Sequence, residues 1–242
     1  MEQPVTPSLP LRAARRLRLS AFLALAALAS CGGPEPGVAP TAAAQASAPA
    51  IQRPAGPERL VVAIGDSLYA GYGLKPGEAY PVKLEKALWA KGVNATLVNA
   101  GVSGDTTAAG RQRLGFILDN QPRKPDLVIL GFGGNDMLRA LPPEEAKANL
   151  AAMLAELKRR DIPVLLTGML AAPNLGPDYA AKFNAMYPAL AKQYGAALIP
   201  FFLQPVLGRA DLIQADHVHP TAPGIDLIVG ATVDKVAKEL AA

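Results

Sequence analysis

Short apolar runs alternate with longer amphipathic stretches from Arg59 to the C-terminus, and this alternation restricts the possible fold more than any other feature of the chain. Runs of four or five residues rich in Val, Ile and Leu are typical of buried strands. The stretches between them repeat apolar residues at intervals of three and four, which indicates helices with one buried face. The sequence predicts strands over 60–64, 95–99, 127–131, 164–167 and 196–200, and helices over 78–91, 106–120, 143–160, 179–194 and 223–240.

The first, third and fourth of these strands are apolar on both faces, as strands of a parallel sheet covered by helices on each side should be. Alternating strands and helices with short connections predict one three-layer α/β/α domain over residues 58–242, with a doubly wound parallel sheet. In such folds the ligand site lies at the carboxyl ends of the strands. At the helix starts, Asp105 is expected to cap the helix over 106–120, and Pro143 to open the next one.

The first 31 residues have the pattern of an export signal. Four arginines precede an apolar run, 19–29, that is too short to span a bilayer comfortably. The segment Leu28-Ala29-Ser30-Cys31 resembles the lipobox of bacterial lipoproteins and predicts lipidation of Cys31, the only cysteine. We therefore expect an exported protein of the bacterial periplasm or cell envelope, anchored to a membrane by lipid. An ordinary signal peptidase site near Cys31 stays open, and the pair Arg15-Arg16 leaves open whether export uses the general or the twin-arginine route.

Residues 32–57 are rich in Pro, Ala and Gly and contain almost no large apolar side chains, which predicts a disordered tether. The whole chain has a formal net charge of +4, but residues 1–30 hold four Arg and Glu2, and without them the charge is +1. The basic balance is therefore mostly a property of the leader. Because no basic cluster interleaved with aromatic residues is found in the remainder, we expect no nucleic-acid partner.

Ser67 follows the apolar strand 60–64 directly after Gly65-Asp66, which places its hydroxyl at the carboxyl edge of the predicted sheet. A serine in this place is either a nucleophile or the cap of the next helix, and in isolation the cap is more common. The stretch is not the Gly-x-Ser-x-Gly of α/β-hydrolases, because Tyr69 stands where the second Gly would be.

His219 is one of only two histidines, and Asp216 lies three residues before it. A serine hydroxyl is a weak nucleophile at neutral pH, imidazole is the base best matched to that pH, and a carboxylate would hold the imidazole in one tautomer. Because Pro220 biases His219 away from helix, we expect both residues on the loop before the last helix. Two alternatives stay open: a surface loop without a role, or a metal held by Asp216, His217 and His219, although no further His exists to complete the site.

Gly104 and Asn135 each lie just past a predicted strand, in Ser103-Gly104-Asp105-Thr106 and Gly133-Gly134-Asn135-Asp136. A tetrahedral oxyanion needs rigidly held N–H donors. The backbone N–H of Gly104 can approach closely because glycine has no side chain, and Asn135 offers its side-chain amide. Taken alone, however, Gly-Gly-Asn-Asp is better explained as a turn, and its glycines lack the spacing of a dinucleotide site.

Taken together, Gly65-Asp66-Ser67-Leu68, Ser103-Gly104-Asp105-Thr106, Gly133-Gly134-Asn135-Asp136 and Asp216-His217-Val218-His219-Pro220 resemble the four sequence blocks of the SGNH (GDSL) hydrolase family. The match spans nearly all of residues 60–220. In detail it is most similar to the thioesterase I, lysophospholipase L1 and arylesterase branch. His217 departs from the family pattern, in which Gly is usual at that position.

The resemblance implies a flavodoxin-like fold with a five-stranded parallel sheet. It implies Ser67 as nucleophile, His219 as general base and then general acid, and Asp216 as the residue that orients the imidazole. It also implies an oxyanion hole formed by the backbone N–H groups of Ser67 and Gly104 and the side chain of Asn135. The family uses no metal and no organic cofactor, so none is expected here.

These features predict a monomeric serine hydrolase that cleaves small-molecule or lipid carboxylic esters through an acyl-enzyme. The resemblance implies short to medium acyl esters, aryl esters and thioesters, and the export signal favours lysophospholipids or environmental esters over cytosolic acyl-CoA. The segment 169–176 either lines an acyl pocket or simply connects a strand to a helix. Two other functions stay open: a carbohydrate O-deacetylase of the same broad family, and a non-catalytic lipoprotein that keeps the fold for binding or assembly.

Overall fold

The computed structural model describes residues 51–241. The expected signal peptide, the expected lipidation site Cys31 and most of the expected tether 32–57 lie outside the described residues, so the boundaries at 31 and 57 stay predictions. Residues 51–58 form no helix or strand, but Arg53 donates hydrogen bonds to the side chains of Asn94 and Thr96 at 2.6 and 2.8 Å. No helix within residues 51–241 is long and apolar enough to cross a membrane.

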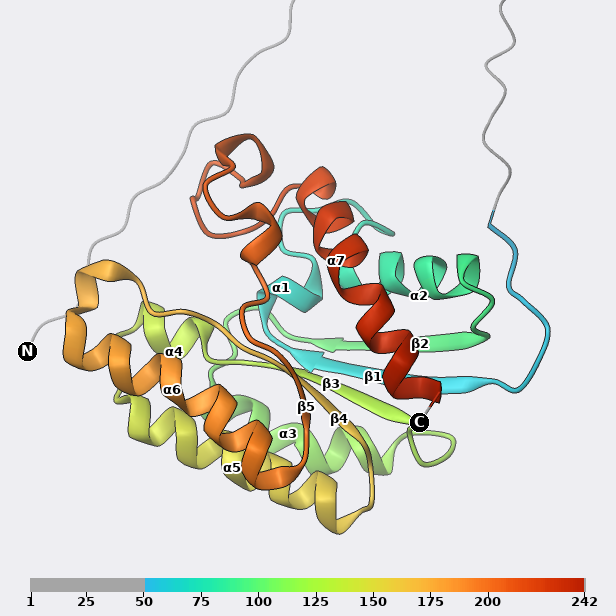
Figure 1. Ribbon diagram of the computed structural model, residues 1–242, viewed down its shortest axis with the longest axis horizontal. Helices are drawn as coiled ribbons and strands as arrows, with labels where there is room; N and C mark the ends of the chain where they lie inside the picture. The colour runs from blue at the N-terminus through green and yellow to red at the C-terminus, as the bar shows by residue number, and fades with distance from the viewer. Residues whose placement is uncertain (1–50, 242) are drawn as a thin grey trace, which may run out of the picture. The chain divides into compact units, whose positions relative to one another are not determined.

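Five parallel strands form one sheet in the order β2-β1-β3-β4-β5, which confirms the flavodoxin-like doubly wound fold (Figure 1). The strands are β1 (Arg59–Gly65), β2 (Ala95–Gly101), β3 (Leu127–Gly131), β4 (Val164–Thr167) and β5 (Ala197–Ile199). The strand order reverses between β1 and β3. A ligand site is therefore expected beyond the carboxyl ends of these two strands.

Helices cover both faces of the sheet (Figure 1). The first face is covered by α2 (Tyr80–Ala90) and α7 (Ala222–Ala241), and the second by α3 (Thr107–Asp119), α5 (Pro143–Arg159) and α6 (Pro177–Tyr194). All five long helices were predicted from their apolar period. The shorter elements were not, because a turn or two of helix shows no period: they are α1 (Ser67–Ala70), α4 (Gly134–Leu138), η1 (Pro173–Leu175), η2 (Gln204–Val206) and η3 (Ala210–Leu212).

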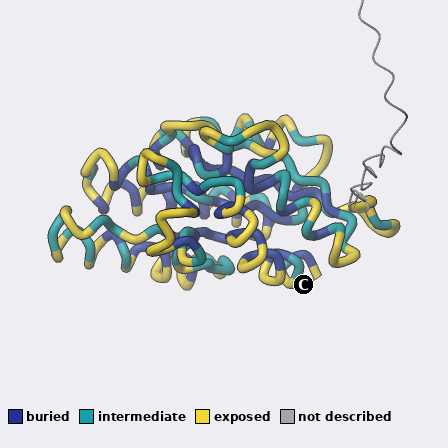
Figure 2. Tube along the Cα trace, turned by 90° about the horizontal axis from the view of Figure 1, so that it is seen from above, coloured by how far each residue is buried: buried dark blue, intermediate teal, exposed yellow. Residues whose placement is uncertain are grey.

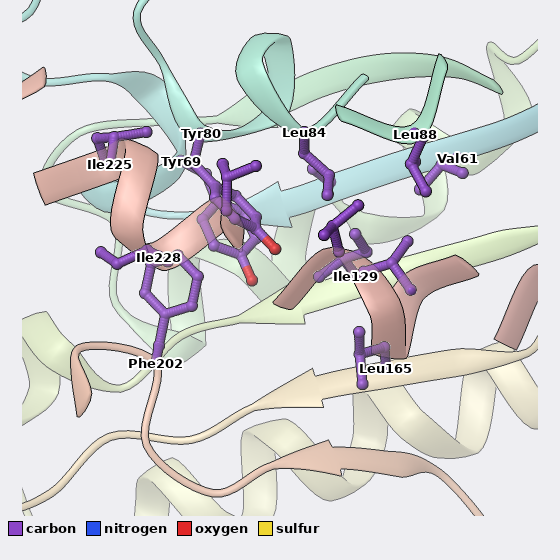
Figure 3. Packing of buried hydrophobic residues seen from close by; sticks show 14 of the residues in the cluster. Val61, Tyr69, Tyr80, Leu84, Leu88, Ile129, Leu165, Phe202, Ile225 and Ile228 are labelled. Carbon is purple, nitrogen blue, oxygen red and sulfur yellow. The ribbon is translucent and has the colours of Figure 1, made fainter. Parts of the chain in front are cut away.

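Successive residues of β1 contribute to two separate hydrophobic cores. Val61 and Ala63 belong to the core under α2 and α7, whereas Val62 and Ile64 belong to the core on the other face, and all four are fully buried. Figure 3 shows part of the first core, which includes Val61 and Ile129 of the sheet, Leu84 and Leu88 of α2, and Ile225 and Ile228 of α7. In Figure 2 the buried chain runs through the middle of the domain and exposed segments surround it. The sheet is thus a rigid base for the loops at its carboxyl edge.

Three glycines stand in register at this carboxyl edge. Gly65 pairs with Gly101 on β2 and with Gly131 on β3. A Cβ atom on Gly65 or Gly131 would lie 2.6 Å from the side chain of Tyr69, and one on Gly101 would lie 2.4 Å from the backbone nitrogen of Ala70. The row of glycines therefore leaves the space in which α1 lies against the edge of the sheet, and α1 carries Ser67.

The start of α3 differs from the prediction. Thr106, not Asp105, caps this helix, and its side-chain oxygen accepts from the backbone N–H of Ala109. The carboxylate of Asp105 is instead paired with Arg113 of the same helix at 2.6 Å. The predicted start of α5 at Pro143 is confirmed.

Candidate active site

Ser67 is the first residue of α1 and lies directly beyond the end of β1. The cap of this helix is Asp66, whose Oδ1 accepts from the N–H of Leu68 at 3.0 Å, so Ser67 does not have the capping role that its position allows. Tyr69 anchors α1 from the other side, because its fully buried hydroxyl lies 2.8 Å from Oγ1 of Thr167 on β4. These two attachments hold the Ser67 hydroxyl at the carboxyl edge of the sheet.

The structure brings three of the predicted site residues into one chain of contacts. Nε2 of His219 lies 2.8 Å from Oγ of Ser67, and Nδ1 lies 2.7 Å from Oδ2 of Asp216. A carboxylate can only accept hydrogen bonds, so it selects the tautomer with the proton on Nδ1 and leaves Nε2 free to accept from the serine hydroxyl. The arrangement therefore has the connectivity that a serine nucleophile and its base require.

The loop that carries His219 is itself closed by backbone and side-chain contacts. Ile213 and Pro220 form an antiparallel bridge across its base. The side chain of Gln214 donates to the carbonyls of Tyr72 and Pro220, both at 2.9 Å, and so connects this loop to the segment after α1. His217 lies at its tip with φ of 60°, the left-handed region that favours glycine, which accounts for the Gly usual at this position in the family.

Asp216 is held in its ionised form by the loop. Partial burial acts to raise the pKa of its carboxyl, but hydrogen bonds from the backbone N–H groups of His219 and Val218, and from the His219 side chain, outweigh burial and lower the pKa to about 2. Both backbone bonds go to Oδ1 at 3.0 Å, which leaves Oδ2 for the imidazole. One carboxylate thus shapes the loop and orients the histidine.

Asp66, next to Ser67, has the opposite shift. Burial raises the pKa of its carboxyl to about 6, and the hydrogen bond from the N–H of Leu68 offsets only part of this effect. Asp105 and Asp136 add to the shift because their negative charges disfavour a third carboxylate nearby. The sequence alone gave no sign of this shift, since it depends on burial.

Gly104 lies on the loop after β2 and Asn135 is the second residue of α4, and the two are connected through Asp105. The side-chain amide of Asn135 donates to the backbone carbonyl of Asp105 at 2.9 Å, and Gly104, with φ of 87°, directly precedes that residue. The turn before Asn135 is tight: Gly133 has φ of 114°, and a Cβ atom there would lie 2.2 Å from the hydroxyl of Tyr187. The Asn135 amide is therefore tied to the segment that carries Gly104, and rigidly held donors are what an oxyanion site requires.

A cavity of about 470 Å³ opens beside Ser67 and Asn135. Most of its wall is apolar and includes Met137, Leu138, Phe201, Leu203 and Leu207. Of the segment 169–176, which was expected either to line an acyl pocket or to connect a strand to a helix, Met169 to Pro173 line this cavity and Leu175 does not. A cavity of this size and character suits a hydrocarbon chain.

Two further side chains contact the site, and the sequence predicted neither contact. The Tyr72 ring packs against the His219 ring with 4.5 Å between the centroids and a tilt of 34°, and Arg113 donates hydrogen bonds to the backbone at the ends of two strands. Tyr72 stands in Ala70-Gly71-Tyr72-Gly73, a stretch similar to the same family branch, but the contacts of both side chains depend on the fold. Among residues 51–241, no group of three or more His, Cys, Asp or Glu side chains is placed to hold a metal ion, so the metal alternative at Asp216, His217 and His219 gains no support.

The comparison with protein families agrees with this geometry. Residues 63–227 match the model of the GDSL-like Lipase/Acylhydrolase family. Esterase TesA of Pseudomonas aeruginosa is 40% identical over 162 residues, which cover 67% of this chain and 80% of that protein. An arylesterase of Vibrio mimicus is 35% identical, covering 76% and 90%, and thioesterase 1/protease 1/lysophospholipase L1 of Escherichia coli K12 is 34% identical, covering 78% and 86%.

Solved structures give the same picture. AlinE4, described as an SGNH-hydrolase family esterase, is 59% identical with a TM-score of 0.66, over 76% of this chain and 97% of that one. The crystal structure of TesA has a TM-score of 0.71 at 35% identity, over 75% and 99%. The psychrotrophic esterase EstA from Pseudoalteromonas, in a structure inhibited by monoethylphosphonate, has a TM-score of 0.71 at 29% identity, over 76% and 100%.

Proposed function

This chain belongs to the GDSL-like lipase/acylhydrolase family, the SGNH hydrolases, and is a carboxylic ester hydrolase; from that premise we propose that it acts through an acyl-enzyme on Ser67. The observation that carries the proposal is the unbroken series of contacts from Ser67 Oγ through the His219 imidazole to Asp216. With the imidazole already in contact with the hydroxyl, proton removal needs no rearrangement of the protein.

The reaction runs in two acyl transfers. Ser67 Oγ attacks the ester carbonyl while its proton passes to Nε2 of His219, and Asp216 stabilises the resulting imidazolium. The tetrahedral intermediate collapses, the bond to the leaving alcohol or thiol breaks, and His219 returns the proton to that group. Water then attacks the acyl-enzyme with His219 again as base, which releases a carboxylic acid and restores Ser67.

The negative oxygen of each intermediate is stabilised by the backbone N–H groups of Ser67 and Gly104 and by the Asn135 amide. The Asn135 nitrogen carries two hydrogens, and its bond to the Asp105 carbonyl uses one of them. That bond holds the amide in place, and its second N–H serves the substrate.

The substrates are esters with an apolar acyl or aryl group, since apolar side chains form most of the wall beside Ser67. Relatives named esterase, arylesterase and thioesterase 1/lysophospholipase L1 support small aryl esters, thioesters and lysophospholipids as candidates. A carbohydrate O-deacetylase would need room for an acetyl group only, and a cavity of about 470 Å³ exceeds that need. A series of p-nitrophenyl esters from acetate to decanoate separates the two functions: activity on acetate alone would favour the deacetylase.

A fluorophosphonate probe tests the catalytic role of Ser67 directly. The wild-type protein should be labelled at Ser67 and lose its esterase activity in parallel. The Ser67→Ala variant should take up no label and should have no esterase activity to begin with. A non-catalytic lipoprotein would stay unlabelled. Labelling of a different residue, or hydrolysis that survives in Ser67→Ala, would contradict the assignment.

We also propose that the protein is exported and anchored through lipid on Cys31, on the sequence pattern of its first 31 residues. An enzyme in that place would meet lysophospholipids or environmental esters rather than cytosolic acyl-CoA. Mass spectrometry of the protein purified from membranes should find Cys31 as a diacylated N-terminus. An unmodified N-terminus at another residue would contradict the anchor without affecting the esterase assignment.

A further inference from the structure

Arg113 of α3 makes an unusual set of contacts at the carboxyl edge of the sheet. Its Nη2 donates to the carbonyl of Gly65 at 2.8 Å, its Nη1 to the carbonyl of Ala100 at 2.6 Å, and its Nε to the carboxylate of Asp105 at 2.6 Å. The guanidinium carbon also lies 5.7 Å from the ring centroid of Phe132. Only 22% of the side chain is exposed.

These four contacts reach three different strand ends. Gly65 ends β1, Ala100 is the penultimate residue of β2, and Phe132 directly follows β3. Each strand end leads within a few residues to one proposed oxyanion donor: β1 to Ser67, β2 to Gly104 and β3 to Asn135. A single guanidinium therefore bonds to the backbone at the ends of β1 and β2 and lies over the ring of the residue that follows β3.

The contact with Asp105 extends this connection to a donor itself. The carboxylate of Asp105 is bound by Arg113, and the backbone carbonyl of the same residue accepts from the Asn135 amide at 2.9 Å. Arg113 does not contact the reacting atoms. Its contacts connect it to Asn135 through Asp105, and to Ser67 and Gly104 through the backbone that precedes them.

Arginine is suited to this task and lysine is not. The planar guanidinium offers five donors in fixed directions, so it can bind two carbonyls and a carboxylate at once, whereas an ammonium group on a flexible stem holds no such fork. An oxyanion hole depends on donors that are already in place before charge develops, and an error of about 1 Å can reduce the rate on the order of 100-fold.

We propose that Arg113 is a positioning residue that sets the three oxyanion donors relative to one another. This inference rests on the proposed function, because it concerns how the acyl-transfer site is held. It predicts an effect on the transition state that exceeds any effect on substrate binding.

The test compares Arg113→Met and Arg113→Lys with a matched control, Arg160→Met. Arg160 is also an ion-paired arginine, bound to Asp119 and Glu156, and 24% of its side chain is exposed, but it follows the C-terminus of α5, away from the candidate site. On p-nitrophenyl butyrate, both Arg113 variants should lose about 10- to 100-fold in kcat with KM within about threefold of wild type. Arg160→Met should keep its kcat. Arg113→Lys retains the charge and decides the question if Arg113→Met does not fold.

Inhibition by phenylboronic acid supplies a readout that loss of stability alone would not change. Ser67 Oγ donates an electron pair to boron and its proton passes to His219, which gives a tetrahedral anion like the reaction intermediate. The inhibition constant should rise in parallel with the loss of kcat in both Arg113 variants. An unchanged inhibition constant in the Arg113 variants would overturn the inference. So would a loss of kcat in Arg160→Met as large as the loss in the Arg113 variants.

Failure of the inference and failure of the proposed function have different signatures. If Ser67→Ala is inactive while Arg113→Lys and Arg113→Met retain full kcat, only the role of Arg113 is wrong. If Ser67→Ala still hydrolyses the ester, the proposed function is wrong and the inference falls with it.

Discussion

Oγ of Ser67 and Nε2 of His219 lie 2.8 Å apart, although 152 positions separate the two residues in the chain. The serine is held by α1 at the end of β1, and the histidine by a closed loop just before α7. Both contacts of the imidazole are already made in this structure, so the proposed nucleophile and its proposed base lie in position without any movement of the chain. Four expected outcomes test the site that follows from this relationship.

Replacing each histidine separately tests which one is the base. His219→Ala should reduce kcat by at least about 10³-fold, because Ser67 then has no proton acceptor. His217→Ala should keep most of the activity, since Ser67 Oγ and the Asp216 carboxylate both contact the ring of His219 and not that of His217. Rates on p-nitrophenyl butyrate check both variants, and the opposite pattern would assign the base to His217.

Removal of the Asn135 amide tests the oxyanion hole. Asn135→Ala should lower kcat by about 10²–10³-fold with little change in KM, because this donor acts on charge that develops only in the transition state. Steady-state kinetics on an aryl ester measure the split. A variant with near wild-type kcat would exclude Asn135 from the oxyanion hole.

The apolar pocket should determine preference for acyl length. Leu170→Ser places a hydroxyl in the wall and should reduce kcat/KM for p-nitrophenyl octanoate by about 3- to 10-fold while acetate changes less than about twofold. Leu227→Ser on α7 is a matched control, because Leu227 is exposed to a similar extent, 44% against 41% for Leu170. Equal losses for both esters, or a loss in the control, would argue against this part of the pocket as the acyl site.

Asp66 should make the protein less stable as pH rises. Burial raises the pKa of its carboxyl from 3.8 to about 6, so the folded state binds this proton more tightly than the unfolded state does. The stability that tighter proton binding by the folded state contributes is fully present below pH 3.8 and is lost as pH rises through about 6. The free energy of unfolding changes by roughly 3 kcal/mol at most.

Asp66→Asn keeps an oxygen that can accept from Leu68 but has no proton to lose. Relative to wild type, its free energy of unfolding should therefore increase between pH 4 and pH 7. Urea unfolding at a series of pH values measures this difference. Asp216 does not interfere, because its pKa is lowered to about 2 and the stability it contributes is lost only as pH falls below its ordinary value of 3.8. Curves that stay parallel across this range would show that Asp66 is not titrating there.

The long elements of this fold were predictable because their signals are local. The period of apolar residues along α5 and α7, and the run of apolar residues in β1, depend only on neighbours in the sequence. The cap of α3 was predicted at the wrong residue for the opposite reason. Asp105 has a suitable side chain for a cap, but its carboxylate is bound to Arg113, a contact that becomes visible only in the folded chain.

The candidate site divides in the same way. The sequence by itself determined which residues are chemically able to act, since Ser67, Asn135 and His219 stand in motifs whose residue types and order indicate acyl transfer. Only the tertiary structure decided that they meet, because strand order and the row of glycines at the sheet edge bring loops from distant parts of the chain together. The raised pKa of Asp66 and the contacts of Arg113 also depend on the fold, because burial and convergence of strand ends are properties of packing and not of neighbouring residues.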